Sequence, residues 1–157
     1  MTAAFRLFQP EDTVLQVRGL DGDCRSLLAG DWADLPIHET APLPIVCMTG
    51  REVRPARIYR GVQLIAVLAL CGLSAVPRPQ LKQSLVLCHA ADGYRALFTW
   101  HELFNTVGGE QVLLVTEPHG GLTLVAAADR RAGPRNMQGV VSIEVLELPA
   151  PAADQPP

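Results

Sequence analysis

Charge is scarce in this sequence. Charged residues make up 18% of its 157 residues, below the usual quarter, which predicts that much of the chain faces inward. The formal net charge is −3 at pH 7. A net negative chain is poorly suited to non-specific nucleic-acid binding, which depends on cationic groups that neutralise phosphates. We therefore expect no nucleic-acid partner.

Long hydrophobic runs are also lacking. The most apolar stretch, residues 62–73, is about half as long as a helix that crosses a bilayer. Residues 1–18 do not show the basic and then apolar pattern of a secretory signal. The sequence therefore predicts a soluble protein with no membrane partner, located in the cytoplasm, or in the periplasm if a leader has been removed.

Cysteine pairs with the spacing of a metal or redox motif are absent. No two of the cysteines are separated by two residues, as they are in a zinc knuckle or a thioredoxin-like motif. A chain of this length can bury a core without disulfides, so we expect free thiols. The cysteines are Cys24, Cys47, Cys71 and Cys88. A Gly-rich phosphate loop, a nucleophile elbow and a His-Glu zinc helix are absent as well.

What the sequence contains is a series of short apolar segments separated by turn residues. Strands are expected at residues 14–18, 43–48, 54–59, 84–89, 94–98, 111–116, 122–127 and 141–145. Short helices are expected at residues 31–35 and 100–104, the second after a Thr-x-x-Glu capping-box pattern. Residues 149–157 are rich in Pro and Ala, which predicts a disordered tail. We predict a single domain over residues 1–148.

The clearest helix in the sequence spans residues 62–71. Leu64 and Leu68 belong to an apolar stripe, and further apolar residues extend this stripe around most of the circumference. Gly72 is well placed to end the helix in a left-handed conformation. Such a helix needs cover on several sides, so we expect it in the centre of the domain. The fold class predicted is α+β, with mixed β-sheets around one buried helix.

Cys47 is the residue that says most about chemistry. It ends the apolar run 43–47 and is followed by Met48-Thr49-Gly50-Arg51. A thiol placed where a strand gives way to a loop with Gly and Arg can serve as a soft metal ligand beside an anion site. The alternative is a small buried hydrophobic residue, which an isolated free cysteine usually is.

The order of elements from Val14 to Val145 resembles the molybdopterin-binding fold of the sulfite oxidase family, in its short single-domain form. The matching segments are residues 15–19, 31–36, 59–64, 92–103, 119–125 and 140–145. Cys47 falls where that family places its molybdenum-ligating cysteine. The resemblance implies a molybdopterin cofactor, oxygen-atom transfer between water and a small-molecule substrate, and an electron-transfer partner or a partner subunit.

The sequence departs from the family's pattern near this cysteine. The larger enzymes continue with Ala-Gly-Asn-Arg, and their loop to the segment that matches Tyr59 is far longer, because it wraps the pterin. A Lys-Trp pair expected near the end is replaced by Met137-Gln138. Two other functions therefore remain open. One is a cofactor-free module that keeps the fold and binds another ligand or partner, and the other is an accessory subunit whose cleft another chain completes.

The remaining candidate residues are basic or aromatic side chains at strand ends. Guanidinium groups from two loops would hold the phosphate of the cofactor. Arginines three residues apart in an extended segment alternate between faces, so the first loop cannot point all four at one ligand. For any single arginine the alternative is a solvated loop residue. The predicted cofactor-binding residues are Arg51, Arg54, Arg57, Arg60, His89, Tyr94, Arg130 and Arg131.

Overall fold

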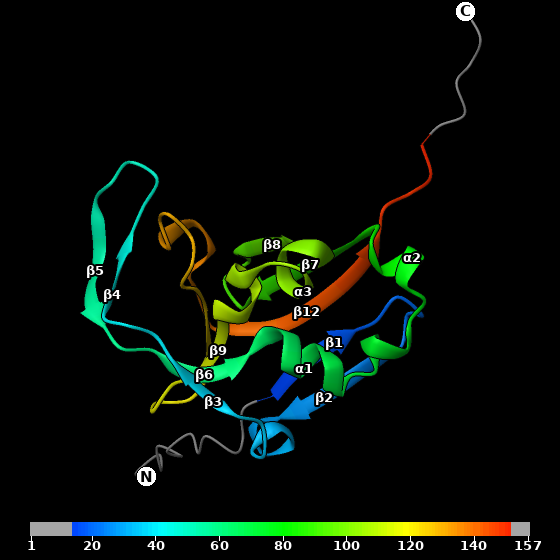
Figure 1. Ribbon diagram of the computed structural model, residues 1–157. Helices are drawn as coiled ribbons and strands as arrows, with labels where there is room; N and C mark the ends of the chain where they lie inside the picture. The colour runs from blue at the N-terminus through cyan, green and yellow to red at the C-terminus, as the bar shows by residue number, and fades with distance from the viewer. Residues whose placement is uncertain (1–13, 152–157) are drawn as a thin grey trace, which may run out of the picture.

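The computed structural model describes residues 14–151, and strands dominate their regular structure (Figure 1). The few helices are short, so the described residues form the α+β class that the sequence predicts. The expected tail lies largely outside the described residues, which end at Pro151. No helix within the described range is long and apolar enough to cross a membrane.

The first sheet, sheet A, has five strands, of which one pair is parallel and the others are antiparallel. In spatial order they are β2 (Cys24–Leu28), β1 (Val14–Arg18), β12 (Val140–Glu147), β7 (Ser84–Ala90) and β8 (Arg95–Thr99). Burial alternates strictly along β7, and Val86 and Cys88 are fully buried. This period of two shows that sheet A buries one face, as in an ordinary half-buried sheet.

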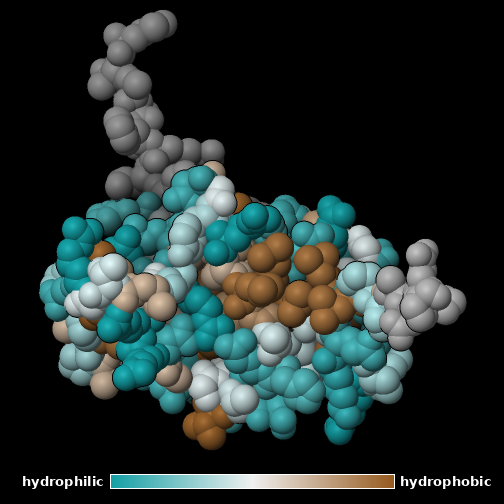
Figure 2. Space-filling model, turned by 90° about the horizontal axis from the view of Figure 1, so that it is seen from above, coloured by the Kyte–Doolittle hydropathy of each residue, from teal (hydrophilic) through white to brown (hydrophobic). Residues whose placement is uncertain are grey.

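The outward face of sheet A carries exposed apolar side chains. Leu97 on β8 and Leu146 on β12 are 48% and 37% exposed. Seen from above, the molecule has an apolar area in the middle of a mostly hydrophilic surface (Figure 2).

The second sheet, sheet B, also has five strands, and all of its pairs are antiparallel. Their order is β11 (Met137–Gln138), β10 (Leu122–Ala126), β9 (Val112–Thr116), β6 (Arg60–Gln63) and β3 (Ile37–Glu39). Every residue of β10 is buried, because both faces of the sheet are covered. One face joins the main core with sheet A, and the other meets a separate two-stranded hairpin.

That hairpin consists of β4 (Leu43–Val46) and β5 (Glu52–Arg57), and we call it the Cys47 hairpin. Ile45 is its anchor, buried in a second apolar cluster with residues of β9, β10 and the following loop. Figure 1 shows the hairpin standing at one side of the molecule, beside the loop that connects β10 and β11. We call that connection, residues 127–136, the arginine loop.

Helix α1 (Leu64–Leu70) is the helix expected in the centre of the domain, but it begins two residues later than predicted. Val62 and Gln63 belong to β6 instead, where they pair with β9. Leu68 is fully buried, whereas Leu70 is 43% exposed. The helix is therefore covered on several sides, as predicted, while its C-terminal end is exposed. Gly72 follows it with φ +80°, as predicted.

The second predicted helix is α3 (Trp100–Phe104), and its capping box is present. The side chain of Thr99 accepts from the Glu102 N–H at 3.1 Å, and the Glu102 carboxylate accepts from the Thr99 N–H at 3.1 Å. The single turn expected at residues 31–35 is a 3-10 helix, Ala29–Trp32. The remaining short helices are α2 (Arg78–Leu81) and the 3-10 turns Leu73–Ala75, Val107–Gln111 and Gly133–Arg135.

Candidate functional site

Cys47 follows β4 directly and opens the tight turn at the tip of the Cys47 hairpin. Its N–H donates to the carbonyl of Arg51 at 2.9 Å, and the N–H of Gly50 donates to the carbonyl of Cys47 at 2.9 Å. Gly50 has φ +88°, a conformation that glycine adopts without strain. Residues 47–51 therefore form a hairpin turn that presents the thiol at its tip.

The thiol of Cys47 is partly exposed and polarised by its own turn. Its sulfur lies 2.9 Å from the hydroxyl oxygen of Thr49. This hydrogen bond is the main reason that the pKa of Cys47 is lowered from 9.0 to about 7, and it outweighs the opposite effect of partial burial. The backbone N–H groups of Thr49 and Arg51 and the positive charge of Arg51 lower the pKa further. Near neutral pH a large share of this cysteine is thiolate, the form that binds metals and attacks electrophiles.

The arginine loop packs against the hairpin at this point. A Cβ added to Gly133 would lie 2.4 Å from the carbonyl oxygen of Val46 and 3.0 Å from the Cα of Cys47, so the two backbones touch. A Cβ added to Gly50 would lie 3.8 Å from a guanidinium nitrogen of Arg131. A hollow of about 630 Å³ opens here, lined by Met48, Asp129, Arg130, Arg131, Pro134 and Arg135.

The structure thus brings three of the predicted arginines to the hairpin tip that carries Cys47. Arg51 lies in the same turn and acts on the thiol electrostatically, and Arg130 and Arg131 line the adjoining hollow. All three are exposed. Within residues 14–151, none of the three forms an ion pair. These cations are therefore available to an anionic ligand.

The other three arginines of the first loop have partners inside the protein. Arg54 donates to the side-chain oxygen of Asn136 and so ties the hairpin to the arginine loop. Arg57 pairs with Glu117 at 2.7 Å and stacks over the ring of Tyr59 at 4.2 Å. Arg60 pairs with Glu39 at 2.5 Å. Their three-residue spacing along an extended segment separates them, as the sequence predicts.

His89 and Tyr94 lie in different places. His89 is on the outward face of sheet A, 3.8 Å from the carboxylate of Glu144, in a separate hollow lined by β1, β2 and β12. The structure does not bring it together with Cys47. Tyr94 donates its hydroxyl to the carbonyl of Pro134 at 2.6 Å, so it supports the arginine loop from the side of β8.

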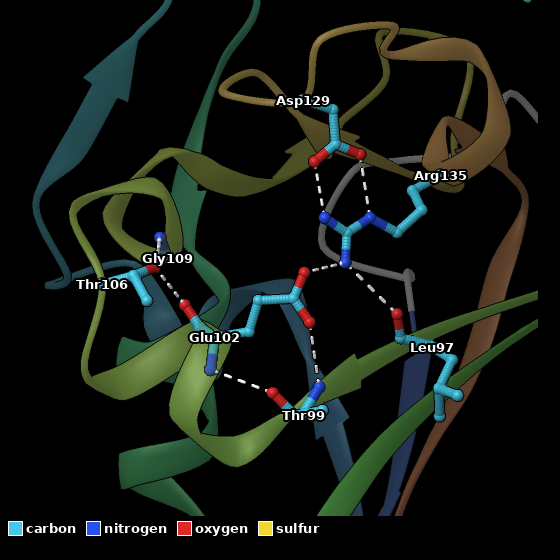
Figure 3. A network of polar contacts seen from close by, with 7 residues as sticks. All are labelled: Leu97, Thr99, Glu102, Thr106, Gly109, Asp129 and Arg135. Carbon is cyan, nitrogen blue, oxygen red and sulfur yellow. Dashed lines mark hydrogen bonds and ion pairs between the residues drawn. The ribbon is translucent and has the colours of Figure 1, made fainter. Parts of the chain in front are cut away.

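Thr49 was not singled out from the sequence, whereas Arg135 was grouped with Arg130 and Arg131 among the second-loop arginines that would hold the phosphate. Thr49 has a visible signal, since a hydroxyl two residues after a cysteine in a turn can reach the sulfur. Arg135 carries the largest set of contacts (Figure 3). Its guanidinium meets Asp129 in the same loop, and Glu102 and the carbonyl of Leu97, which are 33 and 38 positions away. No local pattern could have revealed the two distant partners.

Comparisons with known proteins show similarity at the level of the fold. No family model matches the sequence, and no curated protein matches it. Among solved structures, the sulfane dehydrogenase SoxCD from Paracoccus pantotrophus is similar, with a TM-score of 0.59 and 16% identical residues. The match covers 88% of this chain and 39% of that chain, so this chain spans about two fifths of the solved one. At this identity the similarity establishes the fold alone.

The side chains around Cys47 limit what the site could hold. Residues 14–151 contain no group of three or more His, Cys, Asp or Glu side chains that could hold a metal ion. The only thiol found at the hairpin tip, among the described residues, is that of Cys47, and the neighbouring Met48 adds a neutral thioether. One thiolate beside three available cations fits a cofactor that carries its metal and an anionic group, rather than a bare ion held by protein ligands alone.

Proposed function

We propose that residues 1–148 form a single domain with a sulfite-oxidase-type fold that binds a molybdopterin cofactor at Cys47 and works as an oxidoreductase, with residues 149–157 as a tail. One observation carries this proposal. A thiol with a pKa of about 7 lies in the same hairpin turn as Arg51, and the adjoining arginine loop supplies Arg130 and Arg131; these three arginines make no ion pairs among the described residues. The similarity in fold to a protein named as a dehydrogenase supports the oxidoreductase class.

Each residue has a distinct part in this proposal. The Cys47 thiolate is the protein's ligand to molybdenum, since a soft thiolate suits such a metal. Arg51, Arg130 and Arg131 hold the phosphate of the cofactor through charge-assisted hydrogen bonds. When bound, the cofactor supplies the chemistry of oxygen-atom transfer, and the protein contributes position and electrostatics. The partners are a small-molecule substrate and an electron-transfer protein or partner subunit.

Arg54 and Tyr94 serve this site indirectly. Arg54 bonds to Asn136, whose amide donates to the carbonyl of Leu124 at 3.2 Å. Tyr94 bonds to Pro134 at the far side of the same loop. Arg54 therefore holds the arginine loop against the hairpin, and Tyr94 holds it on the side of β8.

A second function is favoured by the internal pairing of the other arginines. Arg57 and Arg60 are neutralised by Glu117 and Glu39, and the turn after Cys47 closes within five residues. The loop available to hold a pterin here is therefore short. The alternative is therefore a cofactor-free module that uses the same hollow for another anionic ligand or partner.

The pterin content of the purified protein separates these two functions. We expect protein made in a molybdopterin-producing host to release an equimolar amount of pterin on acid extraction. Replacing Arg130 and Arg131 with Gln should lower that yield strongly, because two phosphate contacts are lost. Arg57→Gln is the matched control, since it removes an arginine that is paired elsewhere. Folded wild-type protein without pterin would reject the cofactor proposal in favour of the module.

A further inference from the structure

The arginine loop contains a third arginine that no proposed ligand contact uses. Arg135 presents Nε and Nη2 to the two carboxylate oxygens of Asp129, at 2.8 and 2.5 Å. Its remaining nitrogen, Nη1, donates to Glu102 at 2.5 Å and to the carbonyl of Leu97 at 3.3 Å. The guanidinium also stacks over the ring of Phe98 at 4.3 Å. All three guanidinium nitrogens of Arg135 thus have partners, and its side chain is only 23% exposed.

Asp129 explains why this engagement matters for Cys47. Its carboxylate lines the same hollow as Arg130 and Arg131. A free carboxylate beside two free guanidiniums forms ion pairs with them, because opposite charges a few ångströms apart attract. In the structure both carboxylate oxygens of Asp129 instead accept hydrogen bonds from Nε and Nη2 of Arg135 (Figure 3). Neither Arg130 nor Arg131 forms an ion pair with Asp129 in the described structure.

We propose that Arg135 is a positioning residue for the Cys47 site, which keeps the Asp129 carboxylate engaged so that Arg130 and Arg131 remain available to an anion beside the thiol. The proposal rests on the proposed function in one respect, namely that an anion is what this hollow receives. Nη1 of Arg135 also anchors the arginine loop to α3, because Glu102 is the N3 residue in the capping box of that helix. A lysine could not replace Arg135, because its single ammonium group lacks the two parallel N–H donors that a guanidinium offers to a carboxylate.

The test measures how strongly the thiol prefers an anionic reagent. Cys47 is alkylated by iodoacetate, which is negatively charged, and by iodoacetamide, which is neutral. In both reactions the thiolate forms a thioether bond and iodide leaves. Every protein in this test also carries Cys24→Ser and Cys71→Ser, because these two other thiols are accessible and would react as well. The ratio of the two rates, at low ionic strength and fixed pH, reports the local positive charge and requires no cofactor.

We expect wild-type protein to show a higher ratio of iodoacetate to iodoacetamide rates than the same chain in urea. Arg135→Gln should lower the ratio by about two- to fivefold, the order of effect that one or two nearby unit charges have in water. Adding Asp129→Asn to this variant should restore it, because the released carboxylate is gone. A merely structural role for Arg135 would not be rescued in this way. Arg57→Gln, which breaks an ion pair outside the loop, should leave the ratio unchanged.

The outcomes that overturn the proposal are distinct from those that overturn the proposed function. An unchanged ratio in Arg135→Gln, or a double variant that fails to recover, rejects the role of Arg135 alone. A wild-type ratio equal to that in urea rejects the anion site and with it the proposed phosphate contacts. If Arg135→Gln does not fold, Arg135→Lys is measured instead, and a ratio equal to that of the wild type rejects the proposal.

Discussion

The hydroxyl oxygen of Thr49 lies 2.9 Å from the sulfur of Cys47, inside a turn that the backbone closes with two hydrogen bonds. This contact is the main reason that the pKa of Cys47 is lowered to about 7. The reactivity of the thiol therefore depends on a neighbour only two residues away. It does not require the rest of the fold to bury or charge the cysteine.

Thr49→Val should raise the pKa of Cys47 towards its ordinary value of 9.0, because valine has the same shape as threonine and no hydroxyl. Thiolate is the reactive form, so alkylation by iodoacetamide rises with pH through the pKa. The wild type should reach half its maximal rate near pH 7, and the variant should need a higher pH. Identical pH profiles for the two proteins would show that Thr49 does not set the pKa.

The same shift has a consequence for stability. A thiol whose pKa is lowered by folding stabilises the folded state at pH values above its unfolded pKa of 9.0, and this contribution is lost as the pH falls through about 7. The difference in stability between wild type and Thr49→Val should therefore be larger at pH 9 than at pH 6. Urea melts at the two pH values measure it, and an equal difference would contradict the assignment.

Gly133→Ala should disturb both the fold and the site. The added methyl group would lie 2.4 Å from the carbonyl oxygen of Val46, a backbone atom that cannot rotate away. Overpacking of this kind costs about 1–3 kcal/mol. Gly30→Ala is the matched control, because a methyl group there meets nothing within 4 Å. Urea melts in which the two variants are equally stable would show that the arginine loop does not press on the hairpin.

Leu68→Ala should cost about 2–5 kcal/mol of unfolding free energy, the usual range for a buried leucine. Leu68 is fully buried within the main core. Leu70→Ala gives the comparison, because Leu70 is 43% exposed on the same helix and should cost much less. A loss below about 0.5 kcal/mol for Leu68→Ala, as at a surface position, would mean that α1 is not a core element.

Elements with a strong local pattern could be predicted from the sequence. The stripe of α1 and the capping box of Thr99 and Glu102 are set by residues three and four apart, and both are present. Strand β2 was missed because four of its five residues are exposed, so it shows no apolar alternation. Strand β11 was missed because it has only two residues. Their pairing depends on neighbours elsewhere in the chain.

The same distinction between local patterns and distant contacts applies to the residues of the site. Cys47 and Arg51 are close in sequence, and their turn could be foreseen as a strand end followed by a loop. The contact of Gly133 with Cys47 joins residues 86 positions apart, and the pairing of Arg57 with Glu117 joins residues 60 apart. Which arginines remain available is decided by these distant partners. The sequence could therefore name the candidates but not separate those that are paired from those that are free.

The molybdenum content of the purified protein tests the central proposal most directly. Protein from a molybdopterin-producing host should contain about one molybdenum per chain, as expected for a site with a single thiolate ligand. Cys47→Ser should lose the metal and remain folded, whereas Cys24→Ser, the same change at another exposed thiol, should keep it. Wild-type protein without molybdenum, prepared under conditions that load a related enzyme, would contradict the account, as would a Cys47→Ser variant that retains the metal.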